Sequence, residues 1–176
     1  MFTVKRLKVL SKELFADLVE LYREGYRDDP TYGYREPKRI KSYLKWLLRH
    51  AGEGFWVAFE HEKPAAFLAL EEKAPQPEIH EIVVLPQFRG QRLAERLMTE
   101  VLSYLKTKGY PRVALWVGEH NLRAQRFYAK FGFQKTGKNG IWIRMEKDLH
   151  EKDSTSSHNT VKASSTSERE MVSSGV

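Results

Sequence analysis

The sequence predicts an α/β fold of the α+β type, in which helices cover a sheet built around a central strand-turn-helix unit. Short apolar runs typical of strands alternate with segments whose apolar residues recur every three or four positions, as in amphipathic helices. Hydrophobic residues make up 41% of the 176 residues, which is enough for one core. An apolar run from Glu78 to Leu85 leads through a basic turn into a helical pattern that ends near Lys108, and this supplies the central unit.

The composition divides the chain into one domain and a tail. Residues 1–150 hold nearly all of the aromatic and periodic apolar positions, so we expect one folded domain there. Residues 151–176 are rich in Ser and Thr, with only scattered apolar side chains, and we expect a disordered tail.

The first half of the domain should contain a strand, two helices and a hairpin. A strand near Phe2–Val9 precedes Ser11, a helix N-cap, and a helix follows with Leu14, Leu18 and Leu21 on one face. A second helix follows Pro37 and ends at Gly52. Two apolar runs separated by a polar turn predict a hairpin, Phe55–Phe59 with Ala65–Leu70.

The second half should continue the alternation. After the strand Glu78–Leu85, the helical spacing from about Arg89 to Lys108 ends at Gly109. The later elements are a strand over 112–117, a short helix capped by Asn121, and a closing hairpin of 133–135 with 141–145.

Composition also excludes several classes of protein. The chain has no cysteine, so disulfide scaffolds, thiolate catalysis and Cys-based metal sites are ruled out. The six histidines occur singly and no metal-binding motif is present, so we expect no metal. Apolar runs are far shorter than the roughly 20 residues of a membrane span, and the N-terminus is not a secretory signal, so we expect no membrane partner and a cytoplasmic protein.

A net charge of +7 favours anionic partners but does not choose among them. The turn Arg89–Gly90–Gln91–Arg92 at the start of the central helix suggests one such partner. A helix start has unpaired N–H groups and a partial positive charge, and a glycine-containing turn lets a phosphate approach them. We therefore expect a bound pyrophosphate at this turn, although an Arg-Gly turn before a surface helix often binds nothing.

The segment VVLPQFRGQRLAERLM, followed by NLRAQRFYAKFGF, resembles the GNAT superfamily of N-acetyltransferases. The resemblance is specific over about 78–133 and implies a mostly antiparallel mixed sheet with about four helices. It also implies acetyl-CoA as the acetyl donor. Arg89 matches the first position of the family's phosphate loop and Ala94 the last, whereas Arg92 stands where the family usually has glycine.

The resemblance also implies site residues. The cofactor would contact the main chain of the central strand, the phosphate loop and the start of the last helix: Val83, Val84, Leu85, Arg89, Gly90, Gln91, Arg92, Leu93, Ala94 and Asn121. Acetylation needs a neutral amine, so a base must take a proton. Glu78 and His80 resemble the family's base, a strand bulge would bring Glu81 to the acceptor instead, and Tyr128 resembles the tyrosine that protonates the leaving thiolate.

The acceptor stays open at this stage. The loop between the first two helices carries Tyr32 and Tyr34, which together with Glu81 are the residues we expect to bind an amine acceptor, either a small molecule or a protein. Small amines, peptide N-termini and lysines are all possible, and we expect a monomer or homodimer. A basic nucleic-acid-binding module is less favoured because no compact basic run is present. A third possible function is that of a catalytically silent acyl-CoA sensor, which the altered phosphate loop at Arg92 suggests.

Overall fold

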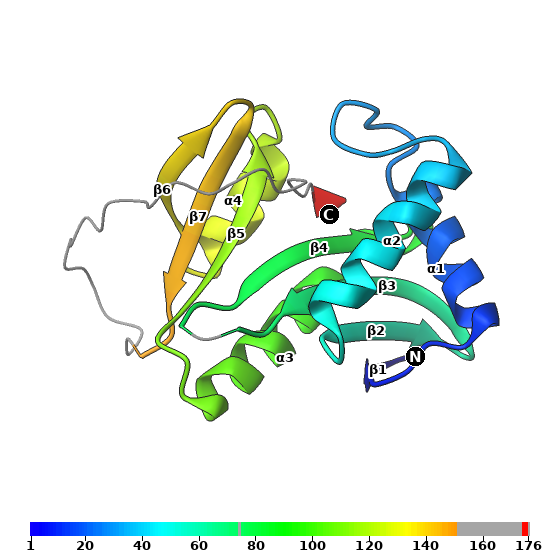
Figure 1. Ribbon diagram of the computed structural model, residues 1–176, viewed down its shortest axis with the longest axis horizontal. Coiled ribbons are helices and arrows are strands. Elements are labelled where there is room, and N and C mark those ends of the chain that lie inside the picture. The colour runs from blue at the N-terminus through cyan, green and yellow to red at the C-terminus, as the bar shows by residue number, and fades with distance from the viewer. Residues whose placement is uncertain (74, 151–173, 176) are drawn as a thin grey trace.

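The computed structural model describes residues 1–73, 75–150 and 174–175, which form one sheet with helices on both faces (Figure 1). The strands lie in the order β1-β2-β3-β4-β5-β7-β6, with β8 beside β4. Neighbouring strands are antiparallel except for β4 with β5 and β4 with β8. The predicted mixed, mostly antiparallel sheet is therefore confirmed. The strands are β1 (Phe2–Leu7), β2 (Phe55–Glu60), β3 (Lys63–Glu71), β4 (Glu78–Val84), β5 (Arg112–Gly118), β6 (Gln134–Asn139), β7 (Trp142–Asp148) and β8 (Ser174–Gly175).

The described residues form four α-helices, as the family resemblance implied, and each begins or ends at a residue suited to that position. The helices are α1 (Lys12–Gly25), α2 (Pro37–Ala51), α3 (Leu93–Lys108) and α4 (Leu122–Lys130), and a short 3-10 helix, η1 (Pro86–Phe88), precedes α3. Ser11 and Asn121 cap α1 and α4 through their side-chain oxygens. Gly109 follows α3 in the left-handed conformation that a side chain would strain.

The structure corrects two boundaries. The central helix begins at Leu93 rather than near Arg89, because Gly90 and Arg92 both have positive φ and cannot continue a right-handed helix. The strand β6 runs to Asn139, beyond the predicted end at Lys135. This edge strand is mostly exposed and polar, so the apolar alternation that marks a buried strand is missing from it.

The core has two parts, one on each face of the sheet. Side chains of α1 and α2 pack on one face, with Leu18, Leu44 and Phe67 among the buried members. Side chains of α3 and α4 pack on the other face, with Leu97 and Tyr128 among them. At the end of β4, Val83 belongs to the first part while Ile82 and Val84 belong to the second, so this strand is buried on both faces. Among the described residues, no helix combines the length and apolar content that crossing a membrane requires.

The centre of the sheet is split between β4 and β5. These strands pair only at Glu78 with Ala114 and at Ile79 with Leu115, and they then diverge (Figure 1). Further along β4, the free edge pairs with β8, through Ile82 with Ser174 and Val83 with Gly175. We predicted a disordered tail over 151–176. Residues 151–173 and 176 lie outside the described residues, so the prediction stays a prediction there, and the structure describes Ser174 and Gly175 as the short strand β8.

A bulge in β4 decides which of its polar residues face the same way. Ala69 pairs with Glu81 and Leu70 pairs with Ile79, so His80 has no partner across the strand pair. Both His80 and Glu81 consequently face α2: His80 lies edge-on to Trp46, and Glu81 is bonded to Tyr43. The parity change that we expected from a bulge is therefore observed.

Candidate active site

A cleft of about 460 Å³ opens where the end of β4, the turn before α3 and the outer face of α4 meet. We call it the basic cleft. Its lining includes Gly90, Leu93 and Ala94 from the predicted phosphate loop, together with a group of cationic side chains, Arg89, Arg92, Arg123, Arg126 and Lys130. Predominantly positive charge beside a helix start suits a phosphate-bearing ligand.

The main chain of the turn fits the same ligand. Gly90 has φ of 82° and Arg92 has φ of 62°, both in the left-handed region. Arg92 is the N-cap of α3 and makes no side-chain bond to the first amides of that helix. A left-handed conformation costs an L-residue about 1–2 kcal/mol, and this explains why glycine suits the position that Arg92 occupies.

Three of the cationic residues that line the basic cleft were not predicted as site residues from the sequence. Arg123, Arg126 and Lys130 lie on α4 and line the basic cleft. Their spacing of three and four residues places them on one helix face, so the periodicity of charge could have identified them. Gln91, in contrast, does not line the cleft and instead donates from Nε2 to the carbonyl oxygen of Gln87 at 3.4 Å.

The guanidinium of Arg89, which we expected to bind phosphate, is already hydrogen-bonded within the protein. Its Nη2 donates to the carbonyl oxygen of Gly25, at the end of α1, at 2.6 Å. Partial burial, and then the positive charge of Arg123, lower the pKa of Arg89 below its ordinary value. The side chain therefore lines the basic cleft and also ties the turn to α1.

The end of α1 lies very close to β4. A Cβ atom at Gly25 would stand 2.3 Å from Cγ1 of Val83, which is less than real contacts allow. Val83 is fully buried here, while Val84 on the opposite face lines the basic cleft. Leu85 follows β4 and donates its N–H to the carbonyl oxygen of Ala65.

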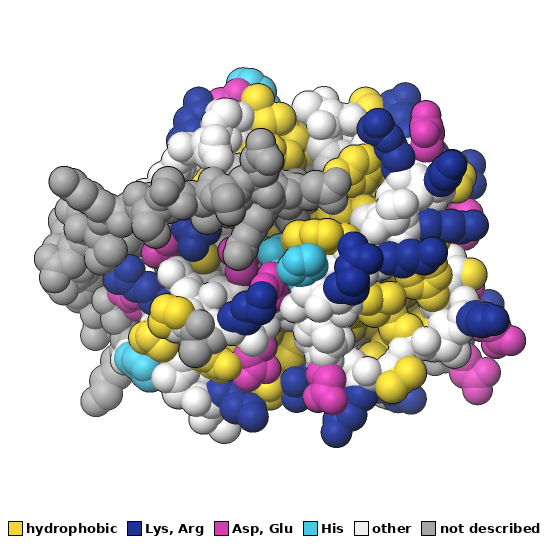
Figure 2. Space-filling model, in the orientation of Figure 1, with side chains coloured by type: hydrophobic (Ala, Val, Ile, Leu, Met, Phe, Trp, Pro, Cys, Tyr) yellow, Lys and Arg dark blue, Asp and Glu magenta, His cyan; other side chains and the backbone are white. Residues whose placement is uncertain are grey.

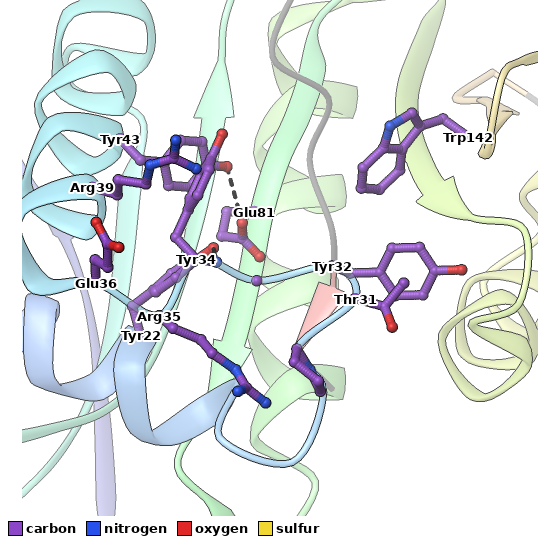
Figure 3. A pocket seen from close by; sticks show the side chains of 12 residues that line it. Tyr22, Thr31, Tyr32, Tyr34, Arg35, Glu36, Arg39, Tyr43, Glu81 and Trp142 are labelled. Atoms are coloured by element: carbon purple, nitrogen blue, oxygen red, sulfur yellow. Dashed lines mark hydrogen bonds between the residues drawn. The ribbon is translucent and has the colours of Figure 1, made fainter.

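A second cleft, of about 370 Å³, lies under the loop between α1 and α2 (Figure 3). We call it the aromatic cleft. Its walls include Tyr32 and Tyr34, the two loop residues predicted to contact the acceptor, and Glu81 of β4 contributes the buried carboxylate. The remaining lining side chains are Tyr22, Pro30, Thr31, Arg35, Glu36, Arg39, Tyr43 and Trp142, with Gly33.

Glu81 is held by two tyrosines and is only 1% exposed. Tyr43 donates its hydroxyl to Oε2 at 2.9 Å, and Tyr26 donates to Oε1. Burial raises the pKa of Glu81 well above its ordinary value, although the bonds from the two tyrosines partly oppose the shift. A carboxylate with a raised pKa is a better proton acceptor once it is ionised.

The other two candidate bases lie elsewhere. His80 is buried and its Nε2 is 2.5 Å from Oε2 of Glu71, while its Nδ1 is 3.8 Å from Oε1 of Glu78. Glu78 also lies 4.0 Å from Nη1 of Arg144. Neither His80 nor Glu78 lines either cleft. The structure therefore brings Glu81 to the aromatic cleft and places His80 and Glu78 in a separate polar group with Glu71 and Arg144.

Tyr128 and Asn121 both belong to the region of α4, Tyr128 as part of the buried core and Asn121 as the helix cap. Tyr128 is 1% exposed and packs edge-on against Phe133, and it lines neither cleft. Burial, and then the negative charge of Glu81, raise the pKa of Tyr128 well above its ordinary value. The phenol therefore keeps its proton at neutral pH. Asn121 accepts a hydrogen bond from the N–H of Ala124 as the cap of α4.

Tyr32 fixes the loop over the aromatic cleft. Its hydroxyl accepts a hydrogen bond from the N–H of His120 at 3.0 Å, and its ring lies 5.5 Å from that of Trp142. A Cβ atom at Gly118 would stand 2.2 Å from the Tyr32 ring, so the ring fits directly onto the main chain at the end of β5. Tyr32 thus connects the loop after α1 to the half of the sheet that holds β5 and β7.

Among the described residues, no cluster of three or more potential metal ligands occurs. Fold and clefts together define a protein that can bind a phosphate-bearing ligand on one face of β4 and a second molecule on the other. The model of the acetyltransferase (GNAT) family matches residues 15–133, and the chain belongs to this family. The family uses acetyl-CoA, so the chain carries an acyltransferase domain with acetyl-CoA as donor.

Individual relatives agree with this assignment. An uncharacterised N-acetyltransferase of Methanocaldococcus jannaschii is 35% identical over 150 residues, which cover 81% of this chain and 66% of the relative. The chain therefore spans about two thirds of that protein's length. A crystal structure of a Pyrococcus horikoshii protein is 34% identical and has a TM-score of 0.77, covering 84% of this chain and 98% of that one.

A more distant structure shows the shared fold. The N-acetyltransferase PaiA of Thermoplasma acidophilum, solved in complex with coenzyme A, has a TM-score of 0.72 at 22% identity. The alignment covers 84% of this chain and 99% of PaiA.

Proposed function

We propose that this protein transfers the acetyl group of acetyl-CoA to a primary amine held in the aromatic cleft, by direct attack in a ternary complex. The observation that carries the proposal is the position of Glu81. It is a buried carboxylate of raised pKa in a cleft on one face of β4, whereas the basic cleft lies against the other face. Donor and acceptor would therefore meet at the strand that both clefts share.

The donor site rests on the turn before α3. The left-handed Gly90 and Arg92 expose main-chain amides at the start of α3, and Arg123 and Arg126 add charge from α4. These groups suit the pyrophosphate of the donor. The main chain at the end of β4, at Val83, Val84 and Leu85, suits an extended arm that binds like an added strand.

The acceptor must lose a proton during the reaction. The amine nitrogen forms a bond to the thioester carbon, the carbon–sulfur bond breaks, and the nitrogen gives a proton to the carboxylate of Glu81. The thiolate that leaves takes a proton from Tyr128, whose raised pKa keeps the phenol protonated beforehand. Tyr26 and Tyr43 hold the carboxylate of Glu81 in place for this step. His80 and Glu78 would then support β4 rather than contact the acceptor.

The test is to measure thiol release from acetyl-CoA with a panel of primary amines, with coenzyme binding followed by calorimetry on the same preparation. We expect amine-dependent thiol release together with saturable coenzyme binding. Coenzyme binding without release for any amine would favour the silent sensor. Salt-sensitive binding of duplex DNA without coenzyme binding would favour the nucleic-acid module.

A further inference from the structure

Charges at the mouth of the aromatic cleft restrict the acceptor further. Arg35 and Arg39 line the cleft, and Glu36 is the acidic residue on the same wall. Glu81, the other carboxylate of the lining, is fully buried and already bonded to two tyrosines. An incoming molecule therefore meets more positive than negative charge before it reaches Glu81.

Both guanidinium groups are available to a ligand. Within the described part of the chain, neither Arg35 nor Arg39 has a carboxylate oxygen within 4.0 Å, whereas Arg23, Arg27, Arg112 and Arg144 each have one. Both residues are exposed. In Figure 3, Arg39 lies beside Tyr43, whose hydroxyl is bonded to Glu81, and Arg35 projects from the loop that carries Tyr34.

The start of α2 strengthens the positive potential, and Figure 2 shows Lys and Arg side chains gathered over this helix. This helix has no acidic residue in its first turn, and its N-cap, Glu36, makes no side-chain capping bond. Lys38 and Arg39 instead place two cations near the positive end of the helix dipole, which is an unfavourable arrangement in the free protein. An anion bound beside Arg39 offsets this repulsion.

The walls between the mouth and Glu81 are aromatic. The rings of Tyr34 and Tyr43 are tilted against each other with their centroids 5.4 Å apart, and the Tyr22 ring lies 5.6 Å from that of Tyr43. A flat or apolar segment fits against such rings. The volume of about 370 Å³ suits a small molecule, since small-molecule sites occupy roughly 300–1,000 Å³.

We infer that the acceptor is a small zwitterionic amine: a primary amine for Glu81, an apolar or aromatic body, and a carboxylate bound by Arg39 with Arg35 at the mouth. This inference rests on the proposed function, because it names the substrate class of the same site. Polyamines and lysine-rich peptides are disfavoured, because their additional positive charges meet the two arginines.

A matched acceptor series tests this inference at constant ionic strength. Phenethylamine carries the amine and ring alone, 4-(2-aminoethyl)benzoate adds a carboxylate at the far end, and L-phenylalanine places the carboxylate next to the amine. Spermidine serves as the cationic comparison. We expect kcat/KM for at least one carboxylate-bearing acceptor to exceed that for phenethylamine by about tenfold or more, the scale of one charge-assisted bond.

Two variants of Arg39 and one control variant locate the effect. Arg39→Gln should abolish most of this preference by raising KM for the carboxylate-bearing acceptor, with little change for phenethylamine, and Arg39→Lys should retain part of it. Lys38→Gln removes the same charge from the neighbouring exposed residue, which does not line the cleft, and should reduce the preference far less than Arg39→Gln does.

Equal rates across the neutral and carboxylate-bearing amines, or the fastest rate with spermidine, would overturn the inference while leaving acetyl transfer intact. Equal effects of Arg39→Gln and Lys38→Gln would overturn it too, because they would indicate only a general influence of charge. If no amine releases thiol, the proposed function fails instead. Calorimetry of 4-(2-aminoethyl)benzoate against the wild type and Arg39→Gln then tests the anion site separately, and equal affinities would refute it.

Discussion

The guanidinium of Arg89 donates to the carbonyl oxygen of Gly25 at 2.6 Å, joining the turn before α3 to the end of α1. The basic cleft contains Arg89, and α1 contributes Tyr22 to the aromatic cleft. One side chain therefore connects elements of both clefts. Because the bond crosses 64 positions of the sequence, it fixes the turn through tertiary structure rather than through local propensity.

Replacing Arg89 by Met should both destabilise the protein and weaken coenzyme binding. Losing a charged hydrogen bond in a partly buried position lowers the free energy of unfolding by about 1–2 kcal/mol. Urea unfolding and calorimetry measure the two effects. Arg96→Met is the matched control, since Arg96 donates to the carbonyl oxygen of Phe2 at 2.7 Å and does not line the basic cleft. Coenzyme affinity equal in the two variants would count against the loop assignment.

Glu81→Gln should reduce turnover by about 100- to 10,000-fold, the usual contribution of a general base. The amide keeps the volume, its oxygen can still accept from one of Tyr26 and Tyr43, and its NH2 group can donate to the other hydroxyl, so coenzyme binding should change little. Glu78→Gln is the control, because Glu78 lies on the same strand but lines neither cleft. A larger loss of turnover in Glu78→Gln than in Glu81→Gln would move the base to Glu78.

Stability should depend on pH through Glu81. Its pKa is raised in the folded state, so the folded protein binds this proton more tightly than the unfolded chain does. The resulting stability is fully present below the ordinary value of 4.5 and is lost as the pH rises through the raised folded pKa. Activity should follow the opposite trend, because the reactive form is the carboxylate.

Urea unfolding of the wild type and Glu81→Gln over a pH series isolates this contribution. Relative to the variant, the wild type should lose stability as the pH rises above 4.5. Glu71 behaves in the opposite sense. Although burial alone would raise its pKa, the bonds from Lys73 and His80 hold it below the ordinary value. Glu71 is present in both proteins, so its effect cancels, and a pH-independent difference would refute the assignment for Glu81.

Arg92→Gly and Arg92→Ala should separate the main chain from the guanidinium. Glycine relieves the left-handed strain and should make the protein more stable than the alanine variant by about 1 kcal/mol, whereas alanine keeps the strain. Both remove a cation from the basic cleft, so we expect coenzyme affinity to fall about tenfold in each. If glycine instead tightens binding while alanine weakens it, the main-chain approach to the phosphates is the limiting factor.

Tyr128→Phe should lower turnover by roughly 10- to 1,000-fold with little effect on coenzyme binding, because it removes the proposed proton donor and keeps the ring. Steady-state kinetics with a fixed amine provides the measurement. Tyr110→Phe serves as a control for the loss of one phenol. Tyr110 follows the end of α3 and donates its hydroxyl to Glu72. Unchanged turnover in Tyr128→Phe would assign the tyrosine to the core alone.

The elements were predictable because their signals are local. Ser11, Gly109 and Asn121 mark helix ends through chemistry that acts within a few residues, and the leucine spacing of α3 gives its buried face. The predicted length of the edge strand β6 was too short, because its side chains face water on both sides and its sequence shows no apolar alternation. The turn before α3 was predicted from its local sequence, but the direction of the Arg89 side chain depends on α1, which is distant in sequence.

The facing of the three candidate bases on β4 could not be predicted from the sequence. Whether Glu78, His80 or Glu81 faces the acceptor depends on a bulge against β3, and a bulge changes the facing of residues without a clear local signal. The two phenols that hold Glu81 come from the end of α1 and from α2, so only the packed structure brings them together. Arg39 is a further example, because its sequence position indicates only an exposed helix residue. The folded chain is needed to place it in the lining of the aromatic cleft.

The short pairing of β8 with β4 has a consequence for donor binding. Ser174 and Gly175 use the edge of β4 at Ile82 and Val83, next to the main-chain groups proposed to hold the arm of the donor. Two partners that need overlapping groups exclude one another, so we expect these residues to compete with the proposed donor arm as a tethered segment. The effective concentration of a tethered competitor is set by the length of its connection. The apparent dissociation constant of the donor should therefore be increased by a factor that does not vary with protein concentration.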